Sequence, residues 1–493
     1  MKEISLIDSH SIIFLLSKYY RQLLFAALII FAWLLGFSLA IKNIQLYLLL
    51  LLALVILFIL FETPFIVLGF FICSFATLNE LLLIKATNIK GLGELCVLDY
   101  LFFGCLVVFT IQILSRKRDI HQTPLNRYII ILLGVSFFAL VRGFMILGNF
   151  DSPIARFRVM TYWIVFFLYI WAIADLKQLK FIFTALILTV LIASILSIVN
   201  FSLGKFSEMT ITAGSEYVAR LPGPVSAKII PVMLFMLIAT VNSVKGRFNS
   251  ILYRITIPVT FLALILRFTR GHWIGFMVGF IYLLSFRQFK YRKQVMSMVV
   301  IFAIVLVVIL STTWQVDPAG SISEDIILRS RGIYDPDPVQ DISTLVRLES
   351  IVVGLKVLFI HPLKGFGFGG YAYRAIHGFG LTKGLYNSYL LWGIETGIVG
   401  LFFLVLFFIV AIRRGRFIIR HIDDKFWKNF MIGIQCSLIA ILTTAFTQYT
   451  FQEIHYVFIL AFLIACPEII YRSSCKMQDS TENNKSDSVN KRG

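Results

Sequence analysis

Four arginines lie in or beside long apolar runs: Arg220, Arg267, Arg270 and Arg347. Ionisable side chains at membrane depth are costly, so each of them is a candidate for function. Only 12 uncharged residues separate Arg254 from Arg267. As a helix they span about 18 Å, which is less than the roughly 30 Å of hydrocarbon in a bilayer. Arg267 is therefore expected below the far surface, with Arg270 one helical turn away.

Arginine forks match phosphate geometry and bind it bidentately. At an effective dielectric near 20, each close contact gives roughly 4 kcal/mol of gross Coulomb attraction. Two or three such arginines on one surface predict a site for a doubly or triply charged anion and would favour a leaving pyrophosphate. Other roles stay open: snorkelling of Arg267 and Arg270 to headgroups, an interfacial anchor at Arg220 and a headgroup contact at Arg347. Arg142 is expected to make a structural pair with Asp151.

Candidates for a general base are few. The histidines and carboxylates expected on the outward side, or within or near spans, are His272, His361, His377, His455, Glu395 and Glu453. Glu453 and His455 belong to QEIHY (452–456), which is expected at a hairpin between the last two spans. A satisfied structural role is the alternative for each of them. CxxC, HExxH and Walker A motifs are missing from the sequence, and neither a metal site nor a cofactor is predicted.

The composition indicates what must position these residues. The chain has 493 residues, of which 59% are hydrophobic and only 14% are charged, whereas soluble domains carry about 25% charge. The net charge of +19 resides in short basic clusters between apolar runs. That pattern is typical of the cytoplasmic loops of a membrane protein and argues against a nucleic-acid partner.

We predict an all-α, polytopic helix bundle with about fourteen spans, within a range of 12 to 14, because a span needs about 20 apolar residues. The spans are expected near 22–41, 44–61, 63–83, 97–115, 128–148, 158–174, 181–203, 226–244, 251–267, 271–286, 295–314, 387–411, 430–451 and 453–470.

The basic clusters all follow an even number of spans, so they share one side, the cytoplasm, together with both termini. The predicted organisation is spans 1–11 over residues 1–314, an outward loop over 315–386, spans 12–14 over 387–470, and a polar, disordered cytoplasmic tail over 471–493. The loop carries seven acidic and seven basic residues, so the positive excess is cytoplasmic.

The outward loop contains a structured element. Apolar residues recur at helical spacing through TLVRLESIVVGLKVLFI (344–360), which predicts an amphipathic helix at the membrane surface. HPLKGFGFGGY (361–371) ends that helix with Pro362 and supplies glycines for tight backbone turns. YNSYLLWGIETGIVGLFF then begins the next span.

These segments resemble the signature region of the O-antigen ligase and polysaccharide polymerase superfamily. RLESIVVGLKVLFIHPLKGFGFGGY and YNSYLLWGIETGIVGLFFLVLFF are similar to its loop helix, its glycine-rich run and its "HNSYL…E-x-G-x-x-G" motif. TRGHWIGFMVGF (269–280) is similar to its "SRG" segment, and AR-x-x-G (219–223) to its "R-x-x-G" segment. The close similarity covers about 60 residues plus these two short segments.

The resemblance implies a GT-C-like, inverting, metal-independent glycosyltransferase of the bacterial cytoplasmic membrane. The donor would be a glycan on undecaprenyl pyrophosphate, and the acceptor a sugar or a lipid-anchored molecule. Membrane lipids surround such an enzyme, and a chain-length regulator is a further partner that the resemblance allows. Its matched arginines, Arg220 and Arg270, would hold the pyrophosphate, and Arg347 matches the arginine of the loop helix.

One position departs from the family pattern. Tyr386 stands directly before Asn387, where the ligase motif has histidine, and both residues are candidates for the catalytic site. A neutral phenol is, however, a weak base at neutral pH. The base is then another residue, such as His377, His361, Glu453 or His455, or leaving-group stabilisation carries most of the reaction. This departure favours a repeat-unit polymerase slightly over an O-antigen ligase in the synthesis of O-antigen, capsule or exopolysaccharide.

The alternative from another class is a lipid-linked oligosaccharide flippase. A flippase is expected to place polar groups along a central cavity near the midplane and to have short loops. A cell-wall glycan polymerase of the shape-and-division type is a third reading. The outward loop and the outward-facing arginines favour an enzyme.

Overall fold

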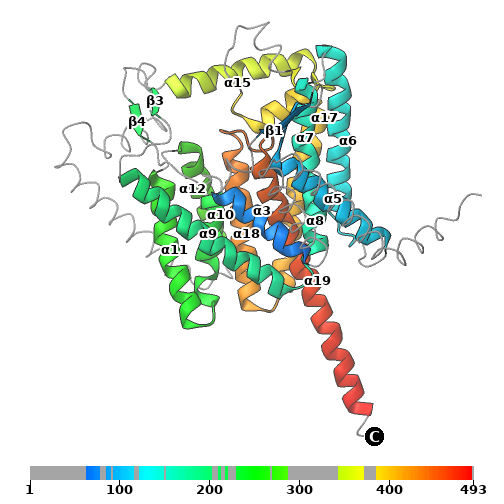
Figure 1. Cartoon of the computed structure of the whole chain (residues 1–493), viewed down its shortest axis with the longest axis vertical. Helices are drawn as coiled ribbons and strands as arrows, with labels where there is room; N and C mark the ends of the chain where they lie inside the picture. Colours follow the sequence, from blue (N-terminus) through cyan, green and yellow to red (C-terminus); the bar gives the residue numbers. More distant parts are fainter. Residues whose placement is uncertain are drawn as a thin grey trace, which may run out of the picture.

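The structure, a computed structural model, is a bundle of helices with one helix lying across its end (Figure 1). It describes residues 63–77, 85–89, 93–115, 121–148, 151–202, 209–211, 217–219, 229–266, 269–286, 342–370 and 385–490. The N-terminal helices of this part are α3 (Pro64–Thr77), α5 (Val97–Leu114), α6 (Asn126–Leu147), α7 (Asp151–Thr161), the 3₁₀ turn η1 (Tyr162–Ile164), α8 (Val165–Ala172) and α9 (Leu176–Ser202).

The helices that follow build the other half of the bundle and its end. They are α10 (Ile229–Thr240) with the 3₁₀ turn η2 (Val241–Ser243), α11 (Arg247–Leu266), α12 (Arg270–Ser285), α15 (Ile342–Ile360), α17 (Ser388–His421), α18 (Lys425–Thr444) and α19 (Ile454–Asn490). Two small antiparallel hairpins occur in connecting segments. They pair β1 (Lys85–Ile89) with β2 (Gly93–Cys96) and β3 (Met209–Ile211) with β4 (Tyr217–Ala219).

Seven helical segments in the described ranges are long and apolar enough to cross a membrane. They are Asn126–Leu147, Ser152–Ala172, Leu176–Val199, Asn249–Leu266, Ser388–His421, Lys425–Thr444 and Ile454–Cys475. The protein is therefore a helical, multi-pass membrane protein. The spans predicted at 22–41, 44–61 and 295–314 lie outside the described residues, so the total of about fourteen and the GT-C-like arrangement stay predictions.

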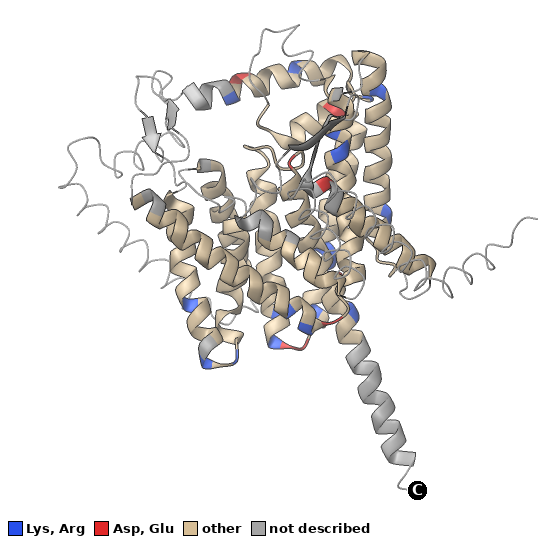
Figure 2. Cartoon of the chain, in the orientation of Figure 1, with Lys and Arg blue, Asp and Glu red and all other residues tan. Residues whose placement is uncertain are grey.

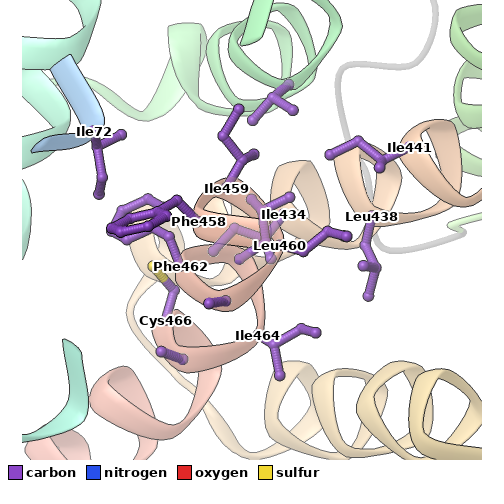
Figure 3. Close-up of a cluster of buried hydrophobic side chains, with 14 of the residues drawn as sticks. Ile72, Ile434, Leu438, Ile441, Phe458, Ile459, Leu460, Phe462, Ile464 and Cys466 are labelled. Carbon is purple, nitrogen blue, oxygen red and sulfur yellow. The ribbon is translucent and has the colours of Figure 1, made fainter. Parts of the chain in front are cut away.

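The core is built around α10, α18 and the apolar first part of α19, Ile454–Cys475, most of whose residues are buried. Every residue of α10 is buried, as expected for a helix that other helices surround. Figure 3 shows how Phe458 and Phe462 of α19 lie beside Ile72 of α3, while Ile434, Leu438 and Ile441 project from α18.

Glycines let α12 approach α18 closely. A Cβ atom on Gly275 would lie 2.3 Å from the hydroxyl oxygen of Thr444 and 2.6 Å from the carbonyl oxygen of Ala440. A Cβ atom on Gly279 would lie 2.9 Å from the carbonyl oxygen of Cys436. Small residues at such spacing allow helix backbones to pack in contact. The position of the start of α12 is therefore determined by α18.

The helix predicted over 344–360 corresponds to α15, which lies across the end of the bundle (Figure 1). One side of α15 packs onto α17, with Val353, Val357 and Leu358 buried against a cluster that includes Leu390 and Ile394. Leu348, Val352, Leu355 and Phe359 lie on the opposite side and are exposed. Two apolar sides are what a helix placed between a protein and lipid would need. Its predicted place at the membrane surface stays a prediction.

Lys and Arg gather at the end of the bundle opposite α15, where α11 begins and α17 meets α18 (Figure 2). This is the distribution that the basic clusters in the sequence led us to expect. α19 is a helix from Ile454 to Asn490, and the disorder and cytoplasmic location expected for the tail over 471–493 stay predictions.

Candidate functional site

An arginine and two tyrosines meet where α15 crosses α17. The guanidinium carbon of Arg347 lies 5.3 Å from the centroid of the Tyr386 ring, within the range of a cation–π contact. The Tyr386 ring lies 5.4 Å from the ring of Tyr449. All three side chains are partly exposed. Tyr386 stands where the family motif has histidine. Its ring therefore contacts Arg347, one of the predicted pyrophosphate ligands.

Asn387 has a structural function. Its side-chain oxygen accepts a hydrogen bond of 3.0 Å from the backbone N–H of Leu390, so it is the N-cap of α17. A cap of this kind satisfies one of the free donors at the start of a helix. Capping fixes the direction in which the chain enters α17, and hence the position of Tyr386 one residue earlier.

The connection between α18 and α19 holds the start of α17. The Ser388 hydroxyl donates to the carbonyl oxygen of Gln448 at 2.7 Å and accepts from the N–H of Thr450 at 2.6 Å. The N–H of Ser388 donates to the carbonyl oxygen of Ala445 at 2.9 Å. We call residues 445–450 the bridging loop, because the start of α12 contacts the same segment.

The first turn of α12 contains Arg270, whose side chain lies outside the described part of the chain. The next two residues, Gly271 and His272, both make hydrogen-bond contacts with other helices. The Thr444 hydroxyl donates to the carbonyl oxygen of Gly271 at 3.2 Å, and Nε2 of His272 lies 3.0 Å from the Tyr456 hydroxyl. That hydroxyl donates in turn to Oε1 of Gln448 at 3.3 Å. The starts of α12 and α17 thus meet the same bridging loop.

The predicted glycine turns form a segment, residues 361–370, that we call the glycine loop. α17 is broken at Gly397, where φ is 79°. The break frees the carbonyl oxygens of Ile394 and Glu395, which accept hydrogen bonds from Phe366 and Gly367 at 2.8 and 2.9 Å. The freed N–H of Ile398 donates to the carbonyl oxygen of Pro362 at 2.7 Å. Irregular backbone at membrane depth is tolerated when protein satisfies it in this way.

Three charged side chains, those of Arg142, Arg156 and Glu395, lie around the glycine loop, and their contacts there were not predicted from the sequence. Arg142 donates from Nε to the carbonyl oxygen of Gly365. Glu395 is buried, accepts from the N–H of Gly369 at 3.4 Å, and lies 3.7 Å from Nε of Arg156. The expected pairing of Arg142 with Asp151 cannot be compared, because the Asp151 side chain lies outside the described part. In the sequence, the only indication of these contacts is a charged residue within or near an apolar segment, because the partners of these residues are distant in sequence.

The remaining candidates are placed as follows. Nε2 of His455, in the first turn of α19, lies 3.2 Å from Oε2 of Glu453, which directly precedes that helix, so the two residues form a pair. The ring of His361 contacts Phe366, with 4.7 Å between centroids. Arg220, Arg267 and His377 lie outside the described residues. The structure brings Arg347, Tyr386 and Asn387 together, and it places the start of α12 against the adjoining loop.

Among the residues that the structure describes, no group of three or more His, Cys, Asp and Glu is arranged to hold a metal ion. The metal-independent reaction expected from the resemblance stays a prediction.

The comparison with known families fits this geometry. Residues 255–405 match the family model described as O-antigen ligase. No individual curated protein matches the chain. The matched segment contains α12, α15, the glycine loop and the broken start of α17. Over residues 255–405, about a third of its length, the chain is thus similar to the O-antigen ligase family, the family that its motifs resemble.

Proposed function

We propose that the protein is a glycosyltransferase that acts at the outer face of the bacterial cytoplasmic membrane. Its donor is a glycan on undecaprenyl pyrophosphate, and its product is a polymerised or ligated glycan of the cell envelope. Repeat-unit polymerisation is slightly favoured over ligation, because Tyr386 replaces the ligase histidine. Both termini then lie in the cytoplasm, and residues 315–386 form the outward loop.

One observation carries the proposal. Segments of the O-antigen ligase match that are distant in sequence converge on one place, where Arg347 covers Tyr386 and the bridging loop joins α12 to α17. Two helices begin there, and the partial positive charge of helix N-termini favours an anion. With Arg270 in the first turn of α12, the charges suit a pyrophosphate that gains negative charge as its bond to the sugar breaks.

The reaction needs one bond to form and one to break. The hydroxyl oxygen of the acceptor attacks the anomeric carbon, the bond from that carbon to the pyrophosphate oxygen breaks, and the configuration inverts. The electron pair leaves with undecaprenyl pyrophosphate, which Arg220, Arg267, Arg270 and Arg347 are proposed to stabilise. The hydroxyl proton passes to a base, for which His377 and the Glu453–His455 pair are the proposed candidates, with Tyr386 the weaker one.

The arginines provide the direct test. Arg220→Ala and Arg270→Ala are each expected to lower transfer about 10²–10³-fold, the cost of removing a group that stabilises developing charge. Arg254→Ala is the matched control, because Arg254 is exposed in α11, whose start lies at the opposite end of the bundle. Membrane levels of each variant should equal those of the parent. Normal polymer from both Arg220→Ala and Arg270→Ala would contradict the proposed role in binding pyrophosphate.

The reaction type is decided by the glycan profile of cells lacking the gene. Single repeats on an acceptor without long chains would establish a polymerase. Long chains that persist on lipid pyrophosphate and never reach an acceptor would establish a ligase. Repeat units trapped on the cytoplasmic face would instead establish a flippase and refute the enzyme.

A further inference from the structure

Gln448, in the bridging loop, uses two different groups to contact two different parts of the site. Its backbone carbonyl oxygen accepts from the Ser388 hydroxyl at 2.7 Å. Its side-chain Oε1 accepts from the Tyr456 hydroxyl at 3.3 Å. Ser388 is the first residue of α17, and Tyr456 belongs to the first turn of α19. One residue therefore connects the start of α17 with the start of α19.

The contact continues to α12. The Tyr456 hydroxyl lies 3.0 Å from Nε2 of His272, which is 3% exposed and belongs to the first turn of α12. Gly271 leaves no room between the two segments, since a Cβ atom there would lie 2.3 Å from the Thr447 hydroxyl oxygen and 3.3 Å from Nε2 of Gln448. The first turn of α12 thus packs directly on the bridging loop.

The chain of polar contacts runs from His272 through Tyr456 and Gln448 to Ser388 and crosses three helix starts. Hydrogen-bonded networks in a low-dielectric interior depend strongly on direction and separation, so they define a geometry more sharply than apolar packing does. Arg270 precedes this network by two residues at one end, and Tyr386 precedes it by two residues at the other. The network therefore spans the two segments that carry the proposed chemistry.

We propose that Gln448 is a positioning residue that sets the separation between the start of α12, with Arg270, and the start of α17, with Tyr386. This inference rests on the proposed function for its catalytic consequence, but its structural content is independent of it. A reacting group displaced by about 1 Å can cost about 10²-fold in rate. Gln448 acts through the two helices and contacts neither of those side chains in any interaction described above.

The test compares Gln448→Leu and Tyr456→Phe with two matched controls. Gln435→Leu removes a buried glutamine of α18 whose amide atoms have no hydrogen-bond partner among the described residues. Tyr169→Phe removes a buried hydroxyl that likewise has none there. Full-length protein in lipid vesicles is given the native lipid-linked donor, extracted from cells lacking the gene. Release of undecaprenyl pyrophosphate is followed.

Gln448→Leu and Tyr456→Phe are expected to lower kcat about 10–100-fold, with the KM for the donor and the melting temperature close to those of the parent. Both controls should keep full activity. Gln448→Glu retains an acceptor oxygen for the Tyr456 hydroxyl and should restore most of the lost rate. A residue that served only folding would lower the melting temperature of the protein and would not show this split between kcat and KM.

A second measurement does not depend on activity. Hydrogen–deuterium exchange should become faster in Gln448→Leu at both the start of α12 and the start of α17, and in neither place in Gln435→Leu. Unchanged exchange at either start would overturn the positioning role, whatever the activity. If exchange changes as expected and the parent releases no lipid pyrophosphate, the proposed function fails while the structural coupling stands.

Discussion

Tyr386 presents an unusual problem for catalysis. It stands one residue before the capping Asn387, at the position where the O-antigen ligase motif has histidine. The guanidinium carbon of Arg347 lies over its ring, 5.3 Å from the ring centroid. A cation on the ring face is held by the π electrons and does not use the hydroxyl group. The tyrosine can thus orient an arginine toward the proposed pyrophosphate without transferring a proton.

We therefore expect Tyr386→Phe to keep activity within about threefold of the parent, because it retains the ring that contacts Arg347. Tyr386→Ala should lose activity about 10-fold or more, since Arg347 then has no ring to hold it. Release of lipid pyrophosphate in vesicles measures both. A loss of 10²-fold or more in Tyr386→Phe would show that the hydroxyl takes part in proton transfer, since loss of a general base typically costs 10²–10⁴-fold.

The residues with chemistry could be found in the sequence, but their partners could not. Arg347 and Tyr386 stand out by type and by motif. Their contact requires α15 to fold back across α17, and no local pattern encodes that. Arg142 donates to the carbonyl oxygen of Gly365, which is 223 residues away. Backbone acceptors carry no signal in residue type, so the sequence cannot identify them.

At the scale of elements, the break in α17 organises the proposed site. Gly397 has φ of 79°, and a Cβ atom on it would lie 2.1 Å from the carbonyl oxygen of Leu363. Both the left-handed backbone and the close approach require glycine. The break supplies the carbonyl oxygens that hold the glycine loop. The glycine of the "E-x-G" motif therefore has a structural role, because it permits this packing.

Gly397→Ala is expected to destabilise the protein by at least about 2 kcal/mol, because it adds left-handed strain to a direct clash with Leu363. Gly104→Ala in α5 is the matched control, since nothing lies within 4 Å of its added Cβ atom. That change should be neutral or stabilising by about 0.5–1 kcal/mol. Thermal unfolding in detergent measures both, and equal melting temperatures would contradict this account of the break.

Element boundaries show what periodicity can predict. The helix expected over 344–360 corresponds closely to α15, Ile342–Ile360, because its apolar spacing continues through almost five turns. The span expected over 158–174 corresponds to Ser152–Ala172, which consists of α7, η1 and α8 in succession. Hydropathy reports the apolar part of a helix, and the polar first turns of α7 extend beyond it.

For the whole molecule, apolar composition and basic clusters led to the correct class, a helical multi-pass membrane protein. They also led to an orientation, with both termini and the basic end of the bundle in the cytoplasm. Figure 2 shows Lys and Arg gathered at the end of the described bundle opposite α15, and the orientation itself stays a prediction. The number of spans depends partly on segments outside those helices.

Reporter fusions test the orientation. A fluorescent protein attached after the last residue is expected to fluoresce, because it would fold in the cytoplasm. Alkaline phosphatase inserted after Gly332, in the predicted outward loop, is expected to be active, because it requires the oxidising exterior. The reverse pattern would invert the orientation and place α15 and the proposed site on the cytoplasmic side.

The glycine loop also determines when this molecule becomes complete during synthesis. Its N–H groups find acceptors at Ala139 in α6, made early, and at Ile394 and Glu395 in α17, made late. Until α17 has been inserted, the N–H groups of Phe366 and Gly367 can be satisfied only by water, because their acceptors are Ile394 and Glu395 and buried backbone groups need partners. The glycine loop should therefore become fully packed only after α17 has been inserted, and a chain truncated before residue 394 should insert its earlier helices yet leave this loop accessible to protease.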